Sequence, residues 1–122
     1  MSLRKALSLM RQAEADLEAG CYDKAVSSAY FACRMAAEQV LIELRAPIPR
    51  RDDKLANSVG NVLGRRVAEE LKLLYSWRIQ ADYYDTEVDR GSAVRILDRA
   101  RALFSRLEEW LREHAERATG GQ

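Results

Sequence analysis

Apolar residues recur every three or four positions along almost the whole of this 122-residue chain, and this spacing limits what it can fold into. On an α-helix the spacing places the residues on one face, whereas a half-buried strand needs strict alternation, which no stretch of the sequence shows. Both prolines, Pro47 and Pro49, fall in one short segment, so they interrupt the pattern only there. The chain is therefore predicted to be all-α.

The apolar stripes predict four long helices and one short one. The helices are expected over residues 2–19, 23–44, about 54–63, 66–83 and about 90–117. The expected core-facing residues are Leu3, Leu7, Met10, Ala13 and Leu17, then Val26, Tyr30, Cys33, Ala37, Val40, Leu41 and Leu44, then Leu55, Val59, Val62 and Leu63, then Val67, Leu71 and Leu74, and finally Val94, Leu97, Phe104, Leu107 and Leu111. Asp23 is the expected N-cap of the second helix. We predict an up-and-down helical bundle over residues 1–118, followed by a flexible tail at 119–122.

Charge and cysteine content exclude several classes of protein. The net charge is +1, so no global field attracts nucleic acid or anionic lipid, and any such contact needs a local patch. Cys21 and Cys33 are too few for a disulfide framework and are expected to be free thiols in the cytoplasm. With a single histidine and no Cys-x-x-Cys pair, we expect no metal and no cofactor. No apolar run approaches the roughly 18 residues of a membrane span.

Two charged residues occupy the apolar stripe of the fourth predicted helix. After Leu71 and Leu74, the next position in register is Arg78, and Asp82 follows one turn later. A charge at a core position must be paired or must face something outside the helix. One interpretation is an ion pair that anchors the bundle. The other is that Arg78 binds a phosphate or an oxyanion while Asp82 fixes its orientation.

Aromatic residues near these charges also allow two interpretations. Tyr30 either packs in the core or a subunit interface, or places its hydroxyl in the same cleft as Arg78, bonded to Asp82 or to a ligand. At the end of the fourth predicted helix, Trp77, Tyr83 and Tyr84 could stack on bases beside phosphate contacts, or simply pack. The accompanying arginines would be Arg65, Arg66 and Arg78.

Three regions together resemble one family. The first helix ends Asp16-Leu17-Glu18-Ala19-Gly20, the second carries residues 25–32 with the sequence AVSSAYFA, and the fourth ends Arg78-x-x-Ala81-Asp82-Tyr83. The fifth adds small residues and an aromatic at 100–104. The chain resembles the HEPN (higher eukaryotes and prokaryotes nucleotide-binding) domain family, in the branch with an Arg-x-x-Ala-Asp-Tyr motif.

The resemblance implies a helical bundle that forms homodimers and partners a minimal nucleotidyltransferase in a toxin–antitoxin-like module. It implies ligand-binding roles for Arg78, Asp82, Tyr83 and Tyr30, with nucleotide or RNA as the ligand. Family members that cleave RNA without metal carry a histidine a few residues after the arginine. Here Tyr83, Tyr84 and Asp85 occupy those positions, and the only histidine is His114.

Binding is therefore predicted in preference to catalysis, with no catalytic residue assigned, because a carboxylate paired with arginine is a poor base at neutral pH. The alternatives are a divergent metal-independent ribonuclease that uses Arg78, and a structural helical adaptor in which Arg78 and Asp82 only staple the helix. By resemblance, Tyr83 or Tyr84 is a candidate for modification by the transferase partner.

Overall fold

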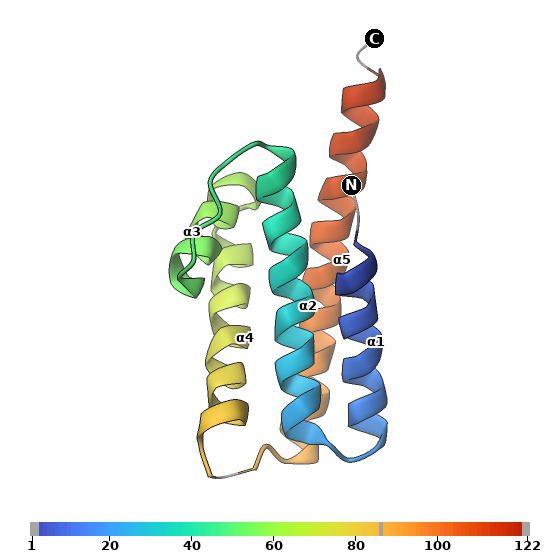
Figure 1. Ribbon diagram of the computed structural model, residues 1–122, viewed down its shortest axis with the longest axis vertical. Coiled ribbons are helices and arrows are strands. Elements are labelled where there is room, and N and C mark those ends of the chain that lie inside the picture. Colours follow the sequence, from blue (N-terminus) through green and yellow to red (C-terminus); the bar gives the residue numbers. More distant parts are fainter. Residues whose placement is uncertain (1–2, 86, 121–122) are drawn as a thin grey trace.

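Figure 1 shows the computed structural model of the protein, which describes residues 3–85 and 87–120. Its helices are α1 (Arg4–Glu18), α2 (Tyr22–Glu43), α3 (Asp52–Leu63), α4 (Arg65–Tyr83) and α5 (Arg90–Gly120). Within the described ranges there is no strand, and the four long helices run alternately up and down, with the short α3 between α2 and α4. The predicted all-α bundle is confirmed.

The helix ends lie close to the predicted ones, except at the C-terminus. There α5 continues to Gly120, so its last turn includes part of the predicted flexible tail. Residues 121–122 of that tail and the predicted start of the first helix at Ser2 lie outside the described residues. Of the part of the chain that the structure describes, no helix combines the length and the apolar character needed to cross a membrane.

Helix α2 is the centre of the bundle. It contacts all four other helices, and in Figure 1 it lies between α1 and α4 with α5 behind it. Its buried residues include a set of five alanines: Ala25, Ala29, Ala32, Ala36 and Ala37. Because the separation of two packed helices depends on the side chains between them, this small-residue surface lets its neighbours approach closely. The larger buried side chains of α2, such as Val40 and Leu41, fill the space towards its C-terminal end.

The predicted stripes have the correct period but are wrong at particular positions. Leu7 and Val94 are 38% and 36% exposed, whereas their neighbours Ala6 and Ala93 are buried. The small residues face the close-packed interfaces, so Leu7 and Val94 lie at the edge of the buried face although their helices keep the predicted orientation: Met10 and Ala13 of α1 and Leu97 and Leu107 of α5 are buried as expected. Two further residues expected in the core are also exposed, at or beyond helix ends: Leu44 and Val62.

Asp23 does not cap α2, contrary to the sequence prediction. The N-cap of α2 is Cys21, and it makes no side-chain cap. Instead, Asp23 Oδ1 accepts a hydrogen bond of 2.9 Å from the backbone N–H of Val88, which is buried just before α5. The carboxylate thus ties the start of α2 to the segment that follows α4.

The packing of α3 on α4 depends on a glycine. A Cβ added at Gly60 would lie 2.6 Å from the Cβ of Ala68, so only glycine allows the two helices to come this close. Gly64, at φ +112°, then forms the sharp turn between them, a backbone conformation that other residues rarely adopt. These two glycines set the course of α4, which carries the Arg78 motif.

Candidate functional site

The Arg78–Asp82 ion pair expected from the one-turn spacing is present on α4. Arg78 Nε lies 2.9 Å from Asp82 Oδ2, and the two side chains are 20% and 29% exposed. Ser27 on α2 donates a hydrogen bond of 3.3 Å from its hydroxyl to the same Asp82 oxygen. The carboxylate is therefore held from two helices, and it holds the arginine in turn.

The guanidinium of Arg78 has no hydrogen-bond acceptor among the described residues. Although Nε is close to Asp82, its N–H does not point at the carboxylate, and this buried nitrogen is left without a partner. No other described side chain or carbonyl accepts from the group. A buried donor without an acceptor costs about 1–3 kcal/mol. The buried Nε is beyond the reach of a ligand, but the terminal Nη groups of this partly exposed side chain also lack an acceptor among the described residues and can bind one from outside.

Two aromatic rings contact this guanidinium. Its Cζ atom is 5.0 Å from the centroid of Phe31 on α2 and 5.5 Å from the centroid of Tyr83 on α4. Both distances are within the range of cation–π attraction. Tyr83 is 69% exposed, so it covers Arg78 on the solvent side without closing access to it.

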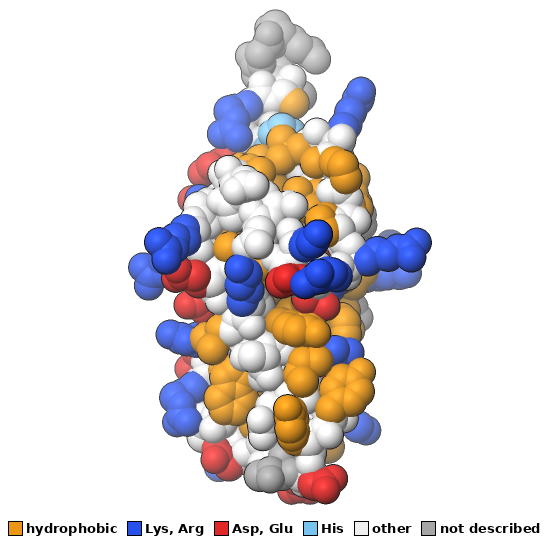
Figure 2. Space-filling model, turned by 90° about the vertical axis from the view of Figure 1, so that its left-hand side faces the viewer, with side chains coloured by type: hydrophobic (Ala, Val, Ile, Leu, Met, Phe, Trp, Pro, Cys, Tyr) orange, Lys and Arg blue, Asp and Glu red, His pale blue; other side chains and the backbone are white. Residues whose placement is uncertain are grey.

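The surface around Arg78 differs on its two sides. On the side of Asp82, a hollow of about 490 Å³ between α1, α2 and α4 is lined by the carboxylates of Asp16, Asp23 and Asp82, and Lys24 is the one basic group among the described residues around it. On the other side of the guanidinium are the rings of Phe31 and Tyr83. Figure 2 shows hydrophobic side chains gathered on the lower half of the face that includes α4, below a band of charged groups. An anion would be repelled by the hollow and would approach Arg78 from the aromatic side.

Tyr30 lies in the core and does not share a cleft with Asp82. It is 2% exposed, and its hydroxyl donates to Asp52 Oδ1 at the start of α3. Its ring makes edge contacts with Phe31 and Tyr75, with centroids 5.4 and 5.7 Å away. Burial, together with the neighbouring Asp52 carboxylate, raises the pKa of the Tyr30 hydroxyl well above its ordinary value of 10.0. Tyr30 thus supports the Arg78 site through Phe31 but does not reach it.

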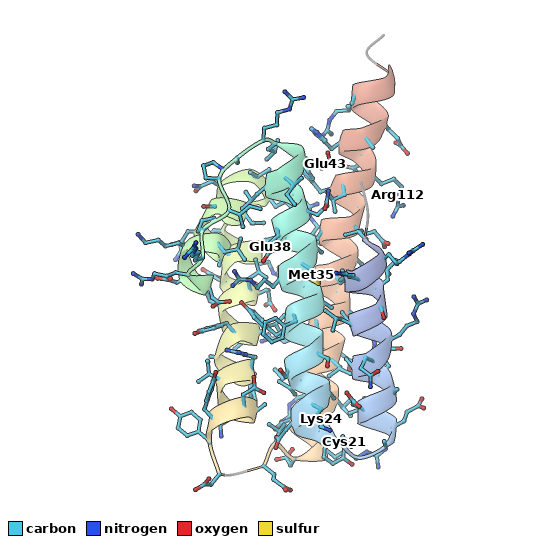
Figure 3. The ribbon with its side chains drawn as sticks, in the orientation of Figure 1. Cys21, Lys24, Met35, Glu38, Glu43 and Arg112 are labelled. Carbon is cyan, nitrogen blue, oxygen red and sulfur yellow. The ribbon has the colours of Figure 1, made fainter. Side chains whose placement is uncertain are left out.

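The tyrosine belongs to a polar network that sequence reasoning missed. Arg34, 16% exposed, contacts the same Asp52 oxygen through Nη1 and donates to Glu38 Oε1 at 2.9 Å and to the carbonyl of Arg50 at 3.3 Å. Glu38 lies on the side of α2 that faces α3 and α4 (Figure 3). The network fastens the loop before α3 to α2. The sequence does contain one sign of this network, because Tyr30, Arg34 and Glu38 are spaced four residues apart and so lie on one face of α2.

The other predicted group of arginines and aromatics is not a single patch. Arg65 and Arg66 are at the start of α4, 12 residues or more before Arg78, which is about 18 Å along a helix. Trp77 is partly buried against the core, while Tyr84 is 60% exposed. Of the described aromatics in this group, Tyr83 alone contacts one of its arginines, so the geometry does not support extended base stacking beside several phosphates.

Two comparisons with known proteins bear on this site. No curated protein sequence matches the chain. A family model described as the HEPN domain matches residues 1–110, which include the ion pair, the Ser27 contact and both aromatic rings. Since this match covers about nine-tenths of the 122 residues, the chain belongs to the HEPN domain family, and this membership indicates a nucleotide- or RNA-related function.

Proposed function

We propose that this protein binds a nucleotide or RNA phosphate through Arg78 and acts as a homodimeric partner of a minimal nucleotidyltransferase in the cytoplasm. The observation that carries the proposal is the unsatisfied guanidinium of Arg78, 20% exposed and contacted by two aromatic rings. Phosphate oxygens would accept from the terminal Nη groups of this partly exposed side chain, and the planar guanidinium fork suits phosphate geometry.

Each neighbour has a separate role in this proposal. Asp82, held by Ser27, limits the movement of Arg78, so that little conformational entropy is lost when an anion binds. Tyr83 offers an exposed ring on which a base can stack. Phe31 forms the opposite, less exposed side of the site.

Binding is favoured over cleavage because no general base adjoins Arg78 among the described residues. His114 stacks on Trp110 in the C-terminal part of α5, with ring centroids 4.8 Å apart. The C-terminal end of α5 and the end of α4 lie at opposite ends of the bundle (Figure 1). The Asp82 carboxylate is already occupied by Arg78 and Ser27.

The proposed dimer would use Tyr84 at the end of α4 and leave the neighbouring Tyr83 ring open to the ligand. Tyr83 and Tyr84 are 69% and 60% exposed, a high exposure for two adjacent aromatic side chains. Replacing Tyr84 with serine is expected to shift the mass measured by light scattering from dimer to monomer. A variant that stays dimeric would exclude this surface.

Binding is best measured by fluorescence anisotropy with a labelled single-stranded RNA, comparing wild type with Arg78→Ala. Arg78→Ala removes the charge-assisted hydrogen bonds from the guanidinium to the phosphate, so it should weaken binding about tenfold or more. Arg65→Ala removes the same charge from a side chain that is 92% exposed, so it should change binding little. Equal binding by wild type and Arg78→Ala would refute the proposal.

The same samples test the two alternatives. Cleavage of the RNA by wild type but not by Arg78→Ala would identify a divergent ribonuclease. A lowered melting temperature in Arg78→Ala, with no RNA binding by wild type, would identify Arg78 and Asp82 as a structural staple. Co-expression with a minimal nucleotidyltransferase, followed by mass spectrometry of Tyr83 and Tyr84, tests the proposed partner.

A further inference from the structure

A cluster of three arginines, separate from Arg78, lines a groove between α4 and α5. The groove has a volume of about 530 Å³ and begins at Leu63, the last residue of α3. Arg66 of α4 and Arg99 and Arg106 of α5 lie around it. None of the residues that surround Arg78 is among those lining this groove.

The spacing of the lining residues places each set on one helix face. On α5, Arg99, Ala102, Leu103 and Arg106 follow the i, i+3, i+4, i+7 pattern, so they form a single stripe two turns long. The two arginines at its ends are separated by about 10 Å along the helix axis. On α4, Val67 and Glu70 continue the face that begins at Arg66.

The floor of the groove is apolar and its rim is basic. Val67 and Leu103 are 6% and 4% exposed, and Leu63 packs partly against the core beside them. The guanidinium groups of Arg66 and Arg106 belong to exposed residues, and Arg99 is 54% exposed. A molecule in the groove would therefore meet hydrocarbon below and guanidinium groups around it.

The positive charge of the rim is mostly uncompensated. Among the described residues that line the groove, the only acid is Glu70, whose Oε1 lies 4.0 Å from Arg99 Nη2. Arg66 and Arg106 have no ion pair or hydrogen bond with any residue in the described ranges. Three arginines against one glutamate leave two positive charges, which matches the charge of a phosphate monoester near neutral pH.

We propose that this groove binds a small phosphorylated organic molecule, with its phosphate on Arg66 and Arg106 and its apolar or aromatic body on Val67 and Leu103. The volume lies in the range of small-molecule sites, roughly 300–1,000 Å³. The stripe on α5 is too short for a partner helix of three turns, which is about 16 Å long. The inference does not rest on the function proposed for Arg78.

The probe for the test is 1-naphthyl phosphate, which combines an aromatic body with a phosphate monoester. Isothermal titration calorimetry should show binding of this probe to wild type, and at least about tenfold weaker binding of inorganic phosphate or 1-naphthol, since each lacks one half of the interaction. Equal binding of inorganic phosphate would show that the floor contributes nothing and would overturn the proposal.

Variants then assign the binding to the groove. Arg66→Ala with Arg106→Ala should weaken binding by at least about tenfold, and so should Ala102→Glu, which adds a negative charge at an exposed position of the groove. The matched control, Arg65→Ala with Arg95→Ala, removes the same charge from the same two helices outside the groove. Equal losses in both double variants would indicate a nonspecific charge effect and overturn the proposal.

Two further measurements distinguish binding in the groove from binding at Arg78 and from self-association. With Arg78→Ala as the starting protein, so that the motif cannot contribute, adding Arg66→Ala and Arg106→Ala should weaken binding of 1-naphthyl phosphate by at least about tenfold. Absence of probe binding by Arg78→Ala itself would place the binding at the motif and overturn the proposal. Light scattering is expected to give one mass for wild type and for the groove variants. A change of mass in the groove variants, with no probe binding by wild type, would make the groove an interface between copies and refute the proposal.

Discussion

The close contact between α3 and α4 gives a prediction whose sign depends on two opposing effects. Replacing Gly60 with alanine improves helix propensity by about 1 kcal/mol. The new Cβ, however, would lie 2.6 Å from the Cβ of Ala68, more than about 1 Å inside ordinary contact. Neither methyl group can rotate away, so the helices must separate, and we take the upper end of the overpacking cost, about 3 kcal/mol. Gly60→Ala should therefore destabilise the protein by about 2 kcal/mol.

Urea denaturation measures this difference, and a reciprocal variant tests its cause. Ala68→Gly alone should cost about 1 kcal/mol through helix propensity. In the double variant, Gly60→Ala with Ala68→Gly, the overlap disappears, so its stability should be close to that of wild type, about 3 kcal/mol better than the sum of the singles. Gly91→Ala is the matched control, because its new Cβ would have as nearest neighbour the Nη1 atom at the end of the long Arg95 side chain, at 3.4 Å. Additive single effects, or a Gly60→Ala variant as stable as wild type, would refute the reasoning.

Three further predictions concern the buried polar groups. Asp52→Ala removes the shared acceptor of Tyr30 and Arg34 and should lower the free energy of unfolding in urea by about 2 kcal/mol, whereas Asp53→Ala, next to it but exposed, should have little effect. Burial raises the pKa of the Cys33 thiol from 9.0 to about 12, whereas Cys21 is exposed. Mass spectrometry after treatment with iodoacetamide at pH 8 should therefore find Cys21 labelled and Cys33 unmodified. Labelling of Cys33 in the folded protein would contradict its burial. Burial raises the pKa values of Cys33 and Tyr30, so the folded state binds both protons more tightly than the unfolded state does. The stabilisation that these protons provide should be fully present below about pH 9 and should be lost as the pH rises towards 12, which would lower the melting temperature. Cys33→Ala should make this decline in melting temperature less steep.

Helix positions could be predicted from the sequence because amphipathic spacing is a local property. The fourth helix was expected to end at Tyr83 and does so, and the second begins two residues earlier than expected, with Cys21 in place of Asp23 at its N-cap. Burial at the edge of each apolar stripe is not local. Leu7 is more apolar than Ala6, but Ala6 is buried because α1 packs closely on the alanine surface of α2. Predicting this requires knowledge of which helices are neighbours, and the periodicity of a single helix does not contain it.

The same distinction applies to the candidate site. Arg78 and Asp82 are four residues apart, so helix geometry alone predicts their contact. The bond from Tyr30 to Asp52 joins residues 22 positions apart across a loop with two prolines, and its formation depends on how that loop packs. The contact of Phe31 with Arg78 likewise depends on the packing of α2 against α4.

Arg34 and Arg78 are similarly exposed and both lie next to aromatic residues, but they differ in the number of hydrogen bonds that their guanidinium groups make. Arg34 donates to Glu38, to Asp52 and to the carbonyl of Arg50, and a ligand could gain little from a guanidinium whose bonds are already made. Arg78 is equally constrained in position, by Asp82 and two rings, but makes none of the corresponding hydrogen bonds within the described chain. A folded protein tolerates such an unmet donor at a measurable cost in stability. A phosphate bound to the terminal Nη groups would stabilise the folded state by mass action, so Arg78 is the arginine at which we expect ligand binding and protein stability to be linked.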